Sequence, residues 1–343
     1  MKPTIYDVAE RAGVSIATVS KVINDKADVG QKTKKRVLQI IEEVGYHPSI
    51  VASALTGKHT HTIGLVIPDI ANPFFAELAR SVEDTGHANG YSVVICNTDN
   101  DPEKEVQYLW WLNQKKVDGV VLGTGMHNIE ALKEFMNQNI PVVLVSRDIP
   151  TLAVSTVLVD DFRGGYLAAQ HLLDLNHRKV LLLVGDLNNS SEQNRLKGFY
   201  AAFEEAGVPP KKSVKIIEEL MTTQQAEQAV IEVLKKDVSV SAAFALTDFL
   251  AIGGIQGARG IGKSVPENFS VVGFDDTFIA VLSYPPLTTI SQPIVEMGEV
   301  VTQTLVDQIK GKKQSSRTII LTPEIKIRKT TAKKAMSLQE PVQ

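Results

Sequence analysis

The stretch that decides the fold is Thr-Ile-Tyr-Asp-Val-Ala-Glu-Arg-Ala-Gly-Val-Ser-Ile-Ala-Thr-Val-Ser-Lys-Val-Ile-Asn at residues 4–24. It predicts two short helices joined by a tight turn. Thr4 and Asp7 form a close variant of the capping box that starts the first helix. Gly13 supplies the left-handed conformation that ends this helix, and Ser15 caps the second. A helix-turn-helix of this kind is how a protein places a helix in a DNA groove, although any small helical hairpin carries a similar pattern.

Each of the two helices has an apolar side and a polar side. Apolar residues recur at helical spacing at Val8, Ala9, Ala12, Val19, Val22 and Ile23. We expect Ile16, Ala17 and Lys21 to read base edges in the major groove. Thr18 and Ser20 should lie nearer the phosphates. The candidate DNA-binding residues of this segment are Thr4, Tyr6, Ser15, Ile16, Ala17, Thr18, Ser20, Lys21 and Asn24.

A third amphipathic helix is predicted over residues 31–44, with Val37, Ile40, Ile41 and Val44 on its inner side. Its first turns carry Lys32, Lys34, Lys35 and Arg36. Cations at a helix start oppose the helix dipole but suit contact with phosphate. Residues 1–60 contain nine Lys and Arg and six Asp and Glu, a net charge of +3, whereas the whole chain is −3. A basic run is often only a solvated surface, but a basic head on an acidic body suits a protein whose head contacts a polyanion.

A linker follows this head. Gly45 ends the third helix, and the residue before Pro48 is pushed out of the helical region. Ser49 then caps a very short helical stretch at residues 50–55. Fewer than two turns of helix are unstable in isolation because nucleation is costly. Something outside this segment must therefore order it.

The rest of the chain alternates apolar runs with amphipathic stretches. Strands are predicted at residues 62–68, 92–97, 119–122, 142–146, 180–185, 242–246 and 271–274. Continuous Val, Ile and Leu runs separated by helices indicate parallel strands covered on both faces. The alternation is too long for one sheet, and a relay lies near residues 159–165. The body is therefore predicted to be α/β, with two doubly wound parallel sheets.

Ligands of such sheets bind beyond the carboxyl ends of the strands, so the residues after each strand are the candidate site. They are Asp69, Asn72, Phe74, Phe75, Ser146, Arg147, Arg195, Thr247, Asp248, Asp275 and Gln292. Arg, Asp and Gln beside Phe suit a sugar-like ligand, because polar groups fix hydroxyls while a ring stacks on an apolar face. The alternative for Asp275 is capping of the following helix. The alternative for Arg195 is a surface ion pair.

At this point the chain resembles the lactose-repressor (LacI/GalR) family of bacterial transcription regulators over nearly its whole length. The resemblance is carried by Thr-Ile-Tyr-Asp-Val-Ala at 4–9, Gly-Val-Ser at 13–15, Thr-Val-Ser-Lys-Val-Ile-Asn at 18–24 and Gly-Tyr-His-Pro at 45–48. Val-Ala-Ser-Ala-Leu-Thr-Gly-Lys at 51–58, Val-Val-Gly-Phe-Asp-Asp at 271–276 and Pro-Leu-Thr-Thr-Ile at 286–290 complete it. The body is also similar to periplasmic sugar-binding proteins. By position, Arg147, Arg195, Asp275 and Gln292 fall where those relatives hold ligand, with Phe74 or Phe75 as the stacking residue.

The resemblance implies a homodimer that binds a pseudo-palindromic, double-stranded operator. Its short linker would fold into a hinge helix on DNA, with Val51 packed on its two-fold mate, Ala52 in the same DNA-binding set and Leu55 as a wedge between base pairs. The expected parts are a headpiece at 1–47, a hinge at 48–60, an effector-binding core at 61–330 and a tail at 331–343. Within the core, an N-subdomain would span about 61–160 and 292–320, and a C-subdomain about 161–291 and 321–330.

Two positions depart from the sugar-binding relatives. Ser146 stands where they commonly have Asp, and Thr247 where they commonly have Asn. An unmodified pentose is therefore less secure as the effector, and a sugar acid, sugar phosphate or other anion stays open because two Arg can pair with an acidic group. The alternative is a regulator controlled mainly by a partner phosphoprotein, as in the catabolite-control type, which shares Ala-Thr-Val-Ser at 17–20.

Other classes of protein are disfavoured. The sequence lacks an apolar run of about 18 residues, and its N-terminus does not read as an export signal, so a cytoplasmic location is expected and a membrane partner is not. We expect Cys96 to be a buried core residue and the acidic run 99–105 to cap a helix. The glycine-rich segment 253–257 lies in a helical stretch and suits close packing, and the tail lacks a leucine heptad. We expect neither an enzyme nor a cofactor.

Overall fold

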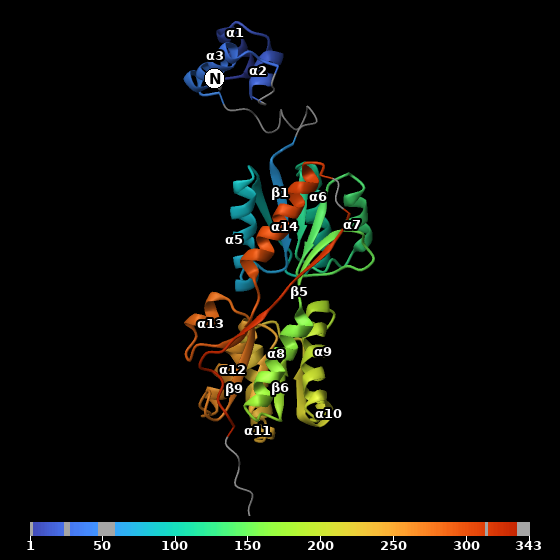
Figure 1. The fold of residues 1–343 in the computed structure, drawn as a ribbon, viewed down its shortest axis with the longest axis vertical. Helices are drawn as coiled ribbons and strands as arrows, with labels where there is room; N and C mark the ends of the chain where they lie inside the picture. The colour runs from blue at the N-terminus through green and yellow to red at the C-terminus, as the bar shows by residue number, and fades with distance from the viewer. Residues whose placement is uncertain (1–2, 24–27, 47–58, 313–314, 335–343) are drawn as a thin grey trace, which may run out of the picture. The chain divides into compact units, whose positions relative to one another are not determined.

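A computed structural model describes residues 3–23, 28–46, 59–312 and 315–334 (Figure 1). The chain divides into two compact units, Met1–Thr60 and His61–Gln343. Among the described residues, none of the helices combines the length and the apolar composition that a membrane span requires. Asn24, Val51, Ala52 and Leu55 lie outside the described residues, as do the tail residues from 335 onward.

The first unit contains α1 (Ile5–Ala12), α2 (Ile16–Ile23) and α3 (Gln31–Val44). Their shared core consists of Val8, Ala9, Ala12, Val19, Val22 and Val37. The Asp7 carboxylate accepts hydrogen bonds from the backbone N–H and the hydroxyl of Thr4, each at 2.7 Å. Gly13 ends α1 with a φ of 60°, and the Ser15 hydroxyl accepts from the Thr18 N–H at 3.2 Å. The three helices and their caps are confirmed.

The second unit contains two six-stranded sheets, of which the first forms the lobe that we call the N-lobe. Its strand order is β11-β5-β4-β3-β1-β2, and all neighbours are parallel. The strands are β1 (Thr62–Ile67), β2 (Ser92–Asn97), β3 (Gly119–Leu122), β4 (Val142–Val145), β5 (Ser155–Val159) and β11 (Thr318–Leu321). Helices α5 (Pro73–Ala88) and α14 (Ile294–Ile309) cover one face, and α6 (Pro102–Gln114) and α7 (Ile129–Met136) cover the other (Figure 1).

The second sheet forms the C-lobe, with the strand order β12-β10-β9-β8-β6-β7. Its strands are β6 (Val180–Leu183), β7 (Val214–Ile217), β8 (Ala242–Ala245), β9 (Ser270–Asp275), β10 (Thr288–Ser291) and β12 (Glu324–Lys326). Helices α8 (Asp161–Asp174) and α9 (Ser190–Glu205) pack on one face, and α11 (Thr223–Lys236) and α12 (Asp248–Gly260) on the other. The short helices α10 (Pro210–Ser213) and α13 (Phe278–Leu282) complete the lobe.

The chain crosses between the lobes three times in the described core: from β5 to α8, from β10 to α14, and from β11 to β12. The last crossing brings β12 antiparallel to β10 at the edge of the C-lobe sheet. The prediction of wholly parallel sheets is therefore wrong for this one strand. A strand that arrives from the other lobe without a crossover helix can enter the edge in the opposite direction.

Seven strands were predicted and all seven are present, but the described structure adds β5, β7, β10, β11 and β12. The additional strands have three to five residues, and each includes at least one Ser, Thr, Lys or Glu. In β10, Thr288 and Thr289 are completely buried. The Thr288 N–H donates to Thr330 Oγ1 at 2.8 Å, and the Thr289 hydroxyl donates to Asp248 at 2.6 Å. Long-range partners make these polar residues compatible with a buried strand.

The glycine-rich segment 253–257, Cys96 and the acidic run 99–105 have the structural roles that the sequence predicts. Gly253 lies within α12, where an added Cβ would lie 2.2 Å from the Thr223 carbonyl oxygen in α11. The glycine-rich segment thus permits close helix packing, as predicted. Cys96 is buried in the N-lobe core. Asp101 caps α6 by accepting from the Glu103 N–H at 2.8 Å, which confirms the helix-cap interpretation of the acidic run.

Two histidines hold the end of the described chain against the C-lobe: His177 is buried and His171 is half-buried. His171 Nε2 lies 3.0 Å from Thr331 Oγ1, and His177 Nε2 lies 3.0 Å from the Ala332 carbonyl oxygen. The His177 Nδ1 atom lies 2.9 Å from the Ser241 hydroxyl. Burial lowers the pKa of both imidazoles below the ordinary value of 6.5. Neutral imidazoles therefore hold this segment in place.

We predict that the free energy of unfolding of the core falls as the pH drops below 6.5, because the unfolded chain takes up protons that native His171 and His177 resist. These groups should have no such effect above that pH. Urea unfolding at about pH 7.5 and pH 5.5 measures the difference. His177→Gln should weaken the pH dependence, whereas His87→Gln, at an exposed position, should leave it unchanged. An identical dependence in the two variants would contradict the assignment.

Candidate functional site

A cavity of about 240 Å³ lies between the two lobes of the core, at the carboxyl ends of their strands. Of the residues proposed from the sequence, those that line it are Asp69, Asn72, Phe74, Phe75, Ser146, Arg147, Arg195, Thr247, Asp275 and Gln292. Asp248 does not line it. The volume is below the range of about 300–1,000 Å³ that is common for drug-sized ligands, so the cavity suits a small metabolite.

The N-lobe contributes an aromatic wall. Asn72 caps α5 by accepting from the Phe74 N–H at 3.0 Å, and Pro73 fills the first helical position. This turn places Phe74 and Phe75 at the cavity, with their rings edge to face and their centroids 5.0 Å apart. Both rings are largely buried. An apolar ring face is the usual partner of the C–H side of a sugar.

The end of β4 forms another part of the N-lobe wall. Ser146 has a φ of 60°, a left-handed conformation that is uncommon for a residue with a side chain. Its N–H donates to the Val157 carbonyl at 2.9 Å, and its carbonyl accepts from the Ser191 hydroxyl of the C-lobe at 3.0 Å. These bonds hold the turned backbone and connect the lobes. Arg147 follows directly and lines the cavity.

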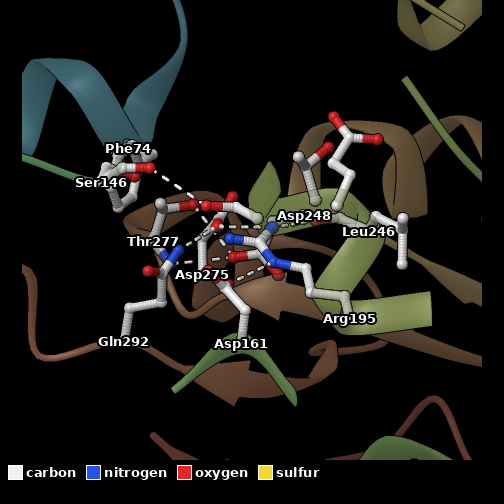
Figure 2. A network of polar contacts seen from close by, with 12 residues as sticks. Phe74, Ser146, Asp161, Arg195, Leu246, Asp248, Asp275, Thr277 and Gln292 are labelled. Carbon is white, nitrogen blue, oxygen red and sulfur yellow. Dashed lines mark hydrogen bonds and ion pairs between the residues drawn. The ribbon is translucent and has the colours of Figure 1, made fainter. Parts of the chain in front are cut away.

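Arg195 lies in α9 and lines the cavity, and Figure 2 shows its side chain beside Asp161, Asp275 and Leu246. Its Nε donates to Asp161 Oδ1 at 2.8 Å and its Nη1 donates to the Leu246 carbonyl, while the guanidinium carbon lies 3.6 Å from the Phe274 ring centroid. Burial opposes the charge, but Asp161 and Asp275 hold the pKa of Arg195 above its ordinary value. The side chain is 5% exposed, so the alternative of a surface ion pair is wrong.

Asp275 ends β9 with a φ of 121°, a strained conformation, and its carboxylate accepts from Gln292 Nε2 at 2.7 Å. Burial raises the pKa of Asp275 well above its ordinary value, although Arg195 Nη1 lies 3.9 Å away. The helix that follows begins at Phe278 with Thr277 as its N-cap residue, so Asp275 does not cap it. Asp275 and Gln292 instead form one polar unit at the cavity, joining β9 to the crossing that leads into α14.

Asp248 was proposed from the sequence as a ligand contact, but its carboxylate is bound by other residues of the protein. Its side chain is buried at the start of α12, near Thr277 and Asp275 (Figure 2). One oxygen accepts from the N–H and the hydroxyl of Thr277, at 2.8 and 3.1 Å, and the other accepts from the Thr289 hydroxyl. Burial raises the pKa of Asp248 to about 7. Thr247, by contrast, lines the cavity and caps α12 through the Leu250 N–H.

We predict that Asp248→Ala lowers the free energy of unfolding of the core by about 3 kcal/mol, because buried donors of Thr277 and Thr289 lose their acceptor. Asp148→Ala, at an exposed position after β4, is the matched control and should change it by less than about 0.5 kcal/mol. Urea unfolding of each variant gives the comparison. Equal stabilities for the two variants would show that Asp248 is not a structural acceptor.

The amino end of α9 supplies cavity residues that the sequence analysis missed. Arg195 was proposed as one of the residues that follow a strand, but α9 begins at Ser190, so Arg195 lies within the helix. The first turn therefore also reaches the cavity. The added lining residues on this side are Asp186, Asn189, Ser191 and Glu192. The Glu192 carboxylate is buried, which raises its pKa, and accepts from the Gly185 N–H at 2.8 Å. The Asx cap at Asn189 was the signal that could have located this helix start.

The helix-turn-helix has its predicted polar surface. Thr4, Tyr6, Ser15, Ile16, Ala17 and Lys21 are exposed, and Thr18 and Ser20 are half-buried. The Tyr6 side chain is 68% exposed, which is unusual for an aromatic residue without a partner surface. Lys21 forms an exposed ion pair with Asp28. Exposed pairs contribute little energy, so Lys21 can exchange Asp28 for a nucleic-acid acceptor.

Comparisons with known proteins match the helix-turn-helix and the two-lobed core separately. A family model for bacterial regulatory proteins of the lacI family matches residues 4–49, and one for periplasmic binding proteins and the sugar binding domain of the LacI family matches residues 60–331. The HTH-type transcriptional regulator DegA of Bacillus subtilis is 44% identical over 335 residues, covering 97% of this chain and 99% of DegA.

Solved structures extend the likeness to three dimensions. A LacI family regulator from Enterococcus faecium with bound ribose is 32% identical, with a TM-score of 0.74, over 79% of this chain and 99% of that chain. The lac repressor dimer bound to operator and an anti-inducer is 26% identical, with a TM-score of 0.85, over 97% of this chain and 100% of that chain. The chain therefore belongs to the LacI family of DNA-binding bacterial transcriptional regulators.

Proposed function

We propose that this protein is a homodimeric transcriptional repressor whose affinity for a pseudo-palindromic operator is set by a small molecule, a sugar or sugar derivative, bound between the two lobes. The observation that carries the proposal is the cavity whose walls come from both lobes. In the headpiece, α2 would enter the major groove, with Ile16, Ala17 and Lys21 at base edges and Thr18 and Ser20 near phosphates. Thr4, Tyr6, Ser15, Asn24, Val51, Ala52 and Leu55 complete the proposed DNA contacts.

Two hydrogen bonds join the lobes and would respond to a change in their relative orientation. The Ser191 hydroxyl donates to the Ser146 carbonyl, and the Phe278 N–H donates to Glu77 Oε1 at 2.9 Å. A ligand that contacts both walls stabilises one orientation over another in proportion to its difference in affinity for the two. That difference would reach the operator through the spacing of the paired headpieces.

We predict that a ligand of the cavity changes the operator affinity of the full-length protein by about 5- to 150-fold, the usual range of coupling free energies. Selection from random duplex DNA supplies the operator, and gel-shift titrations with saturating ligand measure the change. A fall identifies an inducer and a rise identifies a corepressor. A ligand that binds the core by calorimetry without altering operator affinity contradicts the proposal. Binding of a phosphoprotein by a core that takes no small molecule favours the catabolite-control alternative.

The dimer contact is proposed to include the α13 region of the C-lobe. Phe278, Val281, Leu282 and Tyr284 are all more than half exposed. Grouped apolar side chains at a surface mark a contact with another chain, whereas single ones are ordinary. The lac repressor structure is a dimer on its operator. A second copy of this chain is the proposed partner.

We predict that Leu282→Arg dissociates the dimer, because the 76% exposed Leu282 side chain would be buried in the contact and a guanidinium there would lack a partner. Operator affinity should fall with it, since two linked half-site contacts become independent. Val238→Arg, at an 80% exposed position between α11 and β8, is the matched control. Sedimentation equilibrium reads the mass directly. A Leu282→Arg protein that stays dimeric would remove α13 from the interface.

A further inference from the structure

We propose that the ligand of the cavity is a sugar acid, a monosaccharide-sized polyhydroxy compound with one carboxylate, and that Arg147 is the specificity-determining residue that binds this carboxylate. The inference deepens the proposed effector function and rests on it. It depends on which charged groups around the cavity already have partners within the protein and which do not.

Arg147 is a cation in the cavity wall that the described protein leaves unpaired. Its side chain is half-buried. Among the described residues, none provides a hydrogen-bond or ion-pair partner for its guanidinium. Its charge is attracted by Glu192, Asp186 and Asp161 and repelled by Arg195, all of the C-lobe, although the residue itself follows β4 of the N-lobe. Burial lowers its pKa, the mark of a charge that the surroundings do not compensate. A partly desolvated guanidinium of this kind is completed by an acceptor on a ligand.

The guanidinium of Arg195, which also lines the cavity, already has partners within the protein. Its Nε and Nη1 donate to Asp161 and to the Leu246 carbonyl, and its plane covers the Phe274 ring. Asp161 balances its charge at 2.8 Å, and Asp275 lies 3.9 Å away. A ligand anion on Arg195 would have to compete with these fixed carboxylates. Arg147 is therefore the cation that a ligand carboxylate would meet without displacing a protein group.

The acidic residues of the cavity do not occupy Arg147. The Glu192 carboxylate accepts from the N–H groups of Gly185 and Asp186, at 2.8 and 3.4 Å. Asp275 is bound to Gln292. Asp69 and Asp186 are exposed, so solvent screens their charges. Glu192 remains the main source of repulsion for a ligand anion, and this gives the test a second variant with the opposite expected effect.

The remaining walls favour a polyhydroxy skeleton with a single negative charge. Phe74 and Phe75 offer ring faces, and Asn72 and Gln292 offer amide groups. One unpaired guanidinium balances one carboxylate. A phosphate monoester carries about −1.5 to −2 near pH 7 and would leave charge uncompensated beside Glu192. A carboxylate and a phosphate could each pair with the guanidinium of Arg147, and the experiment below compares ligands that carry one or the other.

Calorimetry on the full-length protein tests this with a panel of hexuronates and aldonates, their neutral hexoses and the hexose 6-phosphates. We expect an acid to bind more tightly than its matched neutral sugar and its matched phosphate. Arg147→Met should lower the affinity for the sugar acid by roughly 10- to 150-fold, which corresponds to the free energy of charge-assisted hydrogen bonds. Arg178→Met, at an exposed position outside the cavity, is the matched control and should have no effect. Glu192→Gln should strengthen acid binding.

The possible results distinguish failure of the sugar-acid inference from failure of the proposed effector site. A neutral sugar or a phosphate that binds as tightly as its matched acid, or an acid whose affinity survives Arg147→Met, overturns the inference and leaves the effector site standing. A panel with no binder overturns both. Because Arg147 lacks a partner in the described protein, Arg147→Met should keep the melting temperature of the ligand-free protein. A large loss of melting temperature would show that the residue is structural, which also overturns the inference.

Discussion

The Arg195 guanidinium joins three segments of the chain that are far apart in the sequence. It donates to Asp161 at the start of α8 and to the Leu246 carbonyl after β8, and it lies over the Phe274 ring in β9. A buried charge without partners costs several kcal/mol, so these groups must be in place together. Asp161 follows the first crossing from the N-lobe, and the ion pair therefore fixes that crossing to the floor of the cavity. Asp275, which accepts a hydrogen bond from Gln292, lies 3.9 Å from Arg195 Nη1.

The cavity differs in character between its two sides. The N-lobe supplies the Phe74 and Phe75 rings, the turned backbone of Ser146, and the Arg147 guanidinium, which is unpaired among the described residues, whereas Arg195 and Asp275 on the C-lobe side have partners within the protein. Within the described core, three crossings of the chain connect the lobes, together with the hydrogen bonds from Ser191 to Ser146 and from Phe278 to Glu77. In the proposed function, a ligand that contacts both sides would favour one lobe orientation over another.

Much of the fold was predictable because the signals are local. Capping at Thr4 and Ser15 and the glycines that end α1 and α3 lie within a few residues of the helices they define. The seven Val-, Ile- and Leu-rich strands were found for the same reason. Strand β10 was missed because Thr288 and Thr289 look polar until Thr330 and Asp248 provide their partners. Strand β12 was missed, and its direction with it, because it pairs with β10 after a crossing between lobes.

The helix-turn-helix, the alternation of strands and helices, and the polar residues that follow each strand can be found from the amino-acid sequence alone, since all of these depend on neighbours along the chain. Which of those polar residues have partners inside the protein depends on the three-dimensional fold. Asp248 is bound by Thr277 and Thr289, which lie 29 and 41 residues away, and Arg195 is bound by Asp161, 34 residues away. Arg147 is left to face the cavity. Pairing between buried charges and donors depends on distances in space, and no local pattern specifies which partner each one will find.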